Sequence, residues 1–81
     1  MTEYLVAVTP TGKVLVISLA QAPDTGWFLF RYSEGTFESD TWHDTVESAK
    51  EQAAYEYEGL VDSSWSAATG SLEEAVAAAR R

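Results

Sequence analysis

The strand-like segments of this chain are apolar on both of their faces, and this pattern limits how the chain can fold. Alternate side chains of a strand point to opposite faces of its sheet. In the aromatic run that begins at Trp27, Trp27 and Leu29 share one face, while Phe28 and Phe30 share the other. The run at residues 13–20 is apolar on both faces too. Either helices cover both faces of such a sheet, or part of one face is left for a partner.

Turn chemistry divides the first half of the chain into predicted strands. Residues 3–9 and 13–20 are rich in β-branched side chains, and the sequence TPTG between them is typical of a tight turn. A second break at residues 21–26 precedes the aromatic run, and a turn at residues 33–35 leads into a shorter strand around residues 36–38. We therefore predict an antiparallel meander of three or four strands.

The next segment has the signature of an amphipathic helix over residues 45–58. Asp44 or Thr45 caps it, because Glu47 lies three residues after Asp44 as in a capping box. Its apolar side chains recur at helical spacing, namely Val46, Ala49, Ala53 and Tyr57. We expect this helix to pack on the sheet.

The C-terminal helix begins at a second capping box, formed by Ser71 and Glu74. A short segment at residues 63–67, centred on Trp65, precedes this helix as a strand or a loop. The prediction for residues 1–81 is thus a single α+β domain: a meander, a helix packed on it, a short Trp-containing segment and a C-terminal helix.

The charge of the chain is local. The formal net charge is −8, and nine acids face one lysine between residues 34 and 62, whereas the rest of the chain sums to zero. A negative field repels nucleic acid and anionic lipid and attracts basic surfaces. Cysteine is absent, and neither a secretory segment nor an apolar stretch of roughly 20 residues is found. We expect a cytoplasmic protein that binds neither nucleic acid nor membranes.

The first helix is the most informative acidic segment. Glu47 and Glu51 lie four residues apart, and further acids crowd the C-terminal end of the helix, where the helix dipole disfavours anions. Such a helix gives up a little stability to present carboxylates to a basic partner; alternatively, its acids form a solvated face that serves solubility. The residues predicted to dock on a partner are Asp40, Asp44, Glu47, Glu51, Glu56 and Glu58.

Catalytic signatures are weak. The sequence DTWHDT places the one histidine, His43, between Asp40 and Asp44, the least that a metal site needs. Zinc sites usually show a second His or Cys cluster, no serine stands in a nucleophile motif, and the glycines are dispersed. We expect no metal, no cofactor and no enzymatic activity; a small metal-dependent enzyme at these three residues is an alternative.

Two resemblances concern the middle of the chain. The run GWFLFRY at residues 26–32, the sequence DTWHDT and the helix at residues 46–58 resemble small bacterial proteins of unknown function, over about half of the chain. A looser likeness is to HicB-type antitoxins, in which a short meander leads into an acidic helix capped by Asp-Thr, here Asp44 and Thr45. That likeness implies an acidic domain that occludes a small basic toxin. The chain departs from it at His43, where the family has glycine, and lacks a separate DNA-binding segment.

We therefore predict a non-catalytic interaction domain that docks on a basic protein, in the manner of an antitoxin or immunity protein. The alternative is a structural or housekeeping domain that self-associates through the apolar sheet face around Trp27 and Leu29. The interaction domain requires no more than a monomer, whereas the self-associating domain requires a homodimer.

Overall fold

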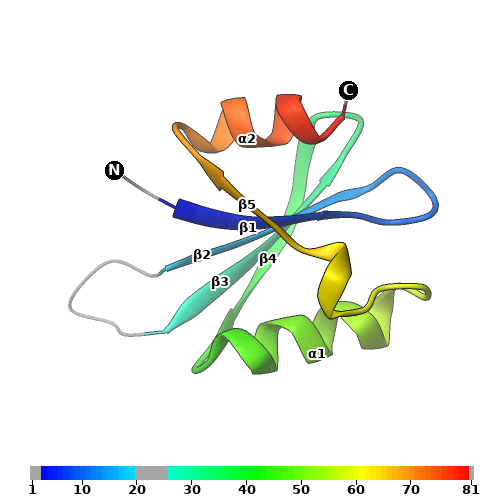
Figure 1. The fold of residues 1–81 in the computed structure, drawn as a ribbon, viewed down its shortest axis with the longest axis vertical. Coiled ribbons are helices and arrows are strands. Elements are labelled where there is room, and N and C mark those ends of the chain that lie inside the picture. Colours follow the sequence, from blue (N-terminus) through cyan, green and yellow to red (C-terminus); the bar gives the residue numbers. More distant parts are fainter. Residues whose placement is uncertain (1–2, 20–25, 81) are drawn as a thin grey trace.

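The computed structural model describes residues 3–19 and 26–80 as one antiparallel sheet between two helices (Figure 1). The strands are β1 (Glu3–Val8), β2 (Val14–Leu19), β3 (Trp27–Ser33), β4 (Thr36–His43) and β5 (Ser66–Thr69). The helices are α1 (Val46–Glu56) and α2 (Leu72–Ala79), and a short 3₁₀ helix, η1 (Asp62–Ser64), precedes β5. The predicted α+β fold is confirmed.

The sheet order is β4-β3-β2-β1-β5, and all neighbouring strands are antiparallel. Strands β1 to β4 form the predicted meander. The prediction of a three- or four-stranded meander is confirmed, and β5 adds a fifth strand to the sheet beside β1, with Val6 opposite Ser66. The segment Ser66–Thr69 reads SAAT and carries no large apolar side chain. Its strand conformation depends on pairing with a distant segment, which local sequence does not reveal.

The turns follow the predicted chemistry where the structure describes them. In the TPTG turn the amide of Thr9 donates to the carbonyl of Lys13 at 2.8 Å, and Gly12 has φ +89°. Glu34 and Gly35, which join β3 to β4, have φ values of +52° and +82°. Two successive positive φ values are those of the hairpin turns that match strand twist. The predicted break at residues 21–26 lies outside the described residues except for Gly26.

Both helices begin at predicted caps. Thr45 rather than Asp44 caps α1, since its side chain accepts a hydrogen bond from the amide of Ser48 at 3.0 Å. α1 is shorter than residues 45–58 because Tyr57 is extended. The capping box of Ser71 at the start of α2 is confirmed. Neither α1 nor α2 is long and apolar enough to cross a membrane.

A separate core fills each face of the sheet. The α1 side contains Ala7, Leu15, Ile17, Leu29, Ala49, Ala53 and Leu60, and the α2 side contains Tyr4, Val6, Val14, Val16, Ala75 and Val76. Figure 1 shows α1 below the sheet and α2 above it. α1 packs on β2, β3 and β4, whereas α2 packs mainly on β1 and β2. The helices therefore cover opposite faces, and the main contacts of α2 are with β1 and β2.

Candidate protein-docking surfaces

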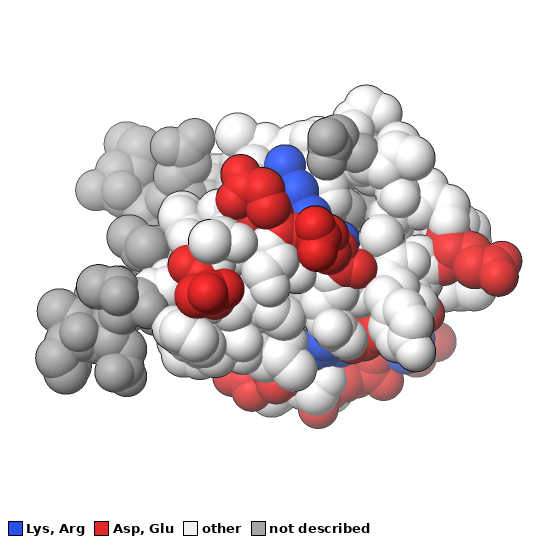
Figure 2. Space-filling model, turned by 90° about the horizontal axis from the view of Figure 1, so that it is seen from below, with Lys and Arg blue, Asp and Glu red and all other residues white. Residues whose placement is uncertain are grey.

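The outward face of α1 carries acidic side chains around one exposed aromatic residue. Glu47, Glu51 and Tyr55 follow one another at intervals of four residues, so they form one stripe on the helix. All three are exposed, and Tyr55 is 87% exposed. Asp44 and Glu58 are exposed beyond the two ends of the helix. Figure 2 looks onto the α1 layer and shows acidic side chains in several groups, with a basic side chain between two of them and mostly uncharged surface around the others. We call these five residues the α1 face.

Glu56 does not belong to the α1 face, although the sequence analysis placed it among the docking residues. Its carboxylate accepts two hydrogen bonds from the guanidinium of Arg31, from Nε and Nη2, both at 2.7 Å. Gln52 donates a further hydrogen bond to Glu56 at 2.6 Å. The side chain of Glu56 is 29% exposed, against 6% for Arg31. Glu56 is thus paired with a buried residue of the protein itself and ties α1 to β3, so we leave it out of the docking set.

Arg31 is a buried charge, and each of its three side-chain nitrogens has a partner within the protein. Besides Glu56, its guanidinium contacts the hydroxyl of Thr41 at 3.3 Å and the carbonyl of Leu29 at 3.4 Å. The hydrogen bonds to Glu56 raise the pKa of Arg31, and those from Arg31 lower the pKa of Glu56. Since a buried charge is tolerated only when it is paired and hydrogen-bonded, this cluster fixes the position of α1 over β3 and β4.

The lowered pKa of Glu56 makes part of the stability dependent on pH. Because the unfolded chain binds a proton here more readily than the folded chain, the contribution of the pair is complete above the ordinary glutamic acid pKa of 4.5. It is lost as the pH falls below that value, through the lowered pKa. The Glu56→Gln variant lacks this titration. We therefore expect urea midpoints of wild type and Glu56→Gln to differ at about pH 7 and to converge towards about pH 3. A constant difference over this range would contradict the assignment.

The structure does not gather the DTWHDT residues into one site. Asp40 lies opposite Phe30, whose side chain packs on the α2 side, whereas Thr41 lies opposite Leu29 on the α1 side. The ring of His43 instead contacts two hydroxyl groups, those of Thr41 at 2.8 Å and Ser48 at 3.4 Å. Within residues 3–19 and 26–80, no cluster of three His, Asp or Glu side chains is close enough to hold a metal. His43 therefore connects β4 to the first turn of α1.

The sheet face around Trp27 and Leu29 is covered. Leu29 is completely buried in the α1-side core, and Trp27 packs against the same cluster. Leu29 is therefore not exposed for the predicted self-association, because α1 covers it. The predicted alternation of side chains along β3 was right, and α1 is the helix that covers the side on which Leu29 lies.

A second exposed apolar surface lies on the α2 side, along β3 and β4. Phe37 and Trp42 are each 50% exposed, and Phe28 and Phe30 are partly buried beside them. The register places Trp42 opposite Phe28. The place of Phe37 on this face was not predicted from the sequence. A bulge shifts the pairing of β4 with β3 between Arg31 and Tyr32, and it interrupts the alternation of side chains on which such a prediction depends. Together with Asp40 these four aromatic residues form what we call the β4 face.

No family model, curated protein or solved structure matches this chain. The two surfaces described above are therefore the basis for any proposal about function.

Proposed function

We propose that this protein is a non-catalytic interaction domain that docks on a basic partner protein through the α1 face. The observation that carries this proposal is Tyr55, an aromatic side chain 87% exposed on a helix whose neighbouring outward positions are carboxylates. Aromatic residues, Tyr above all with Trp and Arg, dominate the binding energy of protein interfaces. A solvated helix face that serves solubility alone has no need of such a side chain.

The surroundings of Tyr55 support the same reading. A small depression of about 110 Å³ lies beside Tyr55. Its lining includes Ala54, which precedes Tyr55 in the chain, together with Glu51 and Val61, and Val61 is 62% exposed. An apolar centre bordered by charged side chains is the usual composition of a docking surface, in which the centre supplies affinity and the rim supplies specificity.

The charges of the α1 face are available to a partner. Among the described residues, the ion pairs are Lys13 with Glu38 and Arg31 with Glu56, and neither uses an acid of this face. With a net charge of −8, the protein attracts basic proteins over distances of about one Debye length, roughly 8 to 10 Å at physiological salt. An inhibitor of a basic protein, such as an antitoxin or immunity protein, is the class that these properties favour.

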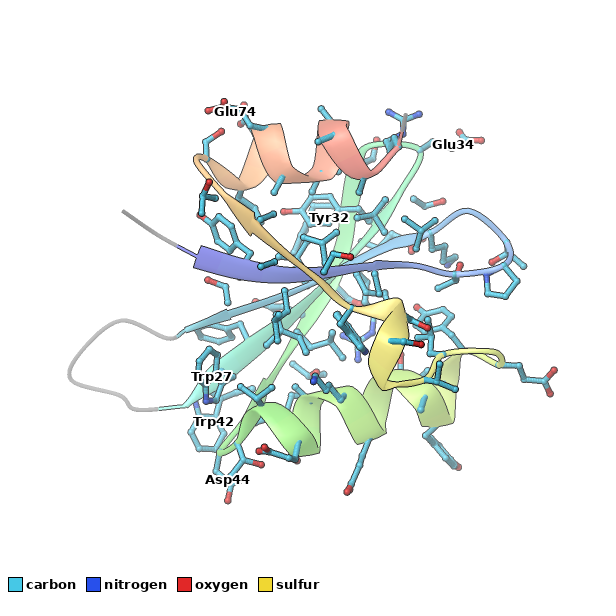
Figure 3. The ribbon with its side chains drawn as sticks, viewed as in Figure 1. Trp27, Tyr32, Glu34, Trp42, Asp44 and Glu74 are labelled. Atoms are coloured by element: carbon cyan, nitrogen blue, oxygen red, sulfur yellow. The ribbon has the colours of Figure 1, made fainter. Side chains whose placement is uncertain are left out.

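Charge reversal on the α1 face tests this proposal. Glu51→Lys and Glu34→Lys each change the net charge by two, but Glu34 lies on the β3–β4 turn, far from α1 (Figure 3). We expect wild-type and Glu34→Lys baits to retain a basic protein from lysate of the native host and to release it at moderate salt. The Glu51→Lys and Tyr55→Ala baits should lose it, and affinity for the purified partner should fall about 10-fold or more.

The two charge-reversed variants, Glu51→Lys and Glu34→Lys, also define the results that would contradict the proposal. If the four baits return the same proteins, the acids of α1 serve solvation and the proposal fails. If Glu34→Lys weakens capture as much as Glu51→Lys does, the effect comes from net charge and not from a docking surface. Thermal unfolding of each bait would establish that all four are folded.

A further inference from the structure

The β4 face is an aromatic surface that stays partly exposed in the part of the chain that the structure describes. The rings of Phe28 and Phe30 stack with their centroids 5.7 Å apart, and Phe37 meets Phe30 edge-on at 6.2 Å. Figure 3 shows Tyr32 beneath α2 and Trp42 at the other end of the β3–β4 ribbon, near the start of α1. Half-exposed Phe37 therefore belongs to one row of rings with Phe28 and Phe30, and half-exposed Trp42 lies opposite Phe28 on the same two paired strands. A contiguous exposed apolar surface of this kind on a small domain usually binds something.

An open groove extends this face towards α2. The groove has a volume of about 760 Å³ and is lined by Tyr32, Phe37, Leu72 and Glu73, among others. It lies between the start of α2 and the β3–β4 hairpin. The β4 face is thus bordered by α2 on one side and is open on the side of the sheet edge.

β4 is itself the edge strand. It is the terminal member of the sheet order, and its residues Thr36–Trp42 are all exposed. In the described part of the chain no strand or helix lies beyond it in the sheet. An edge strand presents unpaired amide and carbonyl groups, so it is a template on which another extended chain can add.

The charge of the face indicates which chain would add. Asp40 lies in the row of aromatic residues, opposite Phe30 and two residues from Trp42. Lys13 bonds Glu38 at 2.9 Å and Arg31 is buried on the α1 side, while Arg80 lies at the β3–β4 turn beside Gly35 and not beside Asp40 in the strand register. If a second copy of this chain added to β4, the acids Glu38 and Asp40 of one copy would face those of the other. Like charges across paired strands are destabilising, so a second copy is disfavoured.

We propose that the β4 face binds an extended basic segment of a partner polypeptide, which adds to the sheet beside β4. Main-chain hydrogen bonds to the edge would supply affinity, and alternate Lys or Arg side chains would lie over the rings of Phe37 and Trp42 close to Asp40. A cation over an aromatic ring is favourable by itself, and a nearby carboxylate adds to the attraction. The proposal rests on the proposed function for the basic character of the partner, but it concerns a different surface, on the opposite side of the sheet from α1.

The test uses capped peptides with the same eight-residue length as β4. One alternates lysine and threonine, a second replaces lysine with glutamate, and a third replaces the threonines with proline, which removes the amide donors needed for strand addition. We expect only the lysine-threonine peptide to bind, with amide chemical-shift changes confined to β3 and β4. Asp40→Lys and Phe37→Ser should each weaken binding about 10-fold, while Glu51→Lys should change it less than about twofold.

Several outcomes would overturn this proposal. The proposal fails if the lysine-threonine peptide does not saturate the protein up to about 1 mM. It also fails if the proline peptide binds as tightly as the lysine-threonine peptide, because no strand would then be added. A concentration-dependent dimer of the free protein that Asp40→Lys alters would make a second copy the occupant. If Glu51→Lys abolishes peptide binding and Asp40→Lys does not, the peptide binds the α1 face, so the proposed function stands without this site. Since Phe37 and Asp40 are exposed, both variants should stay folded, and their thermal unfolding is measured alongside.

Discussion

Replacing Glu56 with alanine is expected to lower the free energy of unfolding by about 2 to 3 kcal/mol. The change leaves the guanidinium of Arg31, which is 5% exposed, without its charged partner. Removing one partner of a fully buried ion pair costs about 3 to 5 kcal/mol. The cost here is lower, because the side chain of Glu56 keeps 29% of its surface in contact with solvent. For a domain of 81 residues, with a total stability of roughly 4 to 12 kcal/mol, this is a large loss.

Two further variants separate the ion pair from other effects of the substitution. Glu51→Ala removes an exposed acid from the same helix, so it should change stability by no more than about 0.5 kcal/mol in urea unfolding. The double variant Arg31→Met with Glu56→Met should recover much of the loss, because apolar side chains of similar length need no compensating charge. Equal costs for Glu56→Ala and Glu51→Ala would show that Glu56 is a surface residue, as the sequence analysis assumed.

The sequence did contain a signal for the position of Glu56. Glu56 follows Ala53 by three residues and Ala49 by seven, so it lies on the stripe of α1 that faces the sheet. Arg31 alternates with Leu29 and therefore points to the same side of β3. What the sequence could not supply was the contact between two residues 25 positions apart, which depends on how α1 lies across the strands.

Features that depend on neighbouring residues were predicted well. The cap at Ser71, the turn at Gly12 and the apolar stripe of α1 follow from local chemistry, and the structure contains them. Features that depend on distant pairing were not. The fifth strand exists because β1 offers an edge to Ser66–Thr69, and the place of Asp40 on the β4 face follows from its register with Phe30. The docking residues predicted as one set are consequently divided between two sides of the sheet.

Leu29 provides the second large expected effect. It is completely buried in the α1-side core, where Ala49 and Ala53 of α1 pack on the sheet. Leu29→Ala removes three carbon atoms and leaves a cavity that small neighbouring alanines cannot fill, so we expect a loss of about 3 kcal/mol in the free energy of unfolding. Tyr55→Ala, which truncates a larger side chain that is 87% exposed, should cost less than about 0.5 kcal/mol.

The comparison of these two variants decides what the apolar alternation of β3 means. If Leu29 lay on a surface for self-association, Leu29→Ala would shift the mass in solution and leave the unfolding midpoint of the monomer nearly unchanged. Because α1 covers this residue, we expect the opposite: an unchanged mass and a much lower urea midpoint. The side of the sheet on which a β3 side chain lies thus determines its role. Leu29 under α1 serves stability, whereas Phe28 and Phe30 lie partly buried on the α2 side, in the face that we propose for a partner.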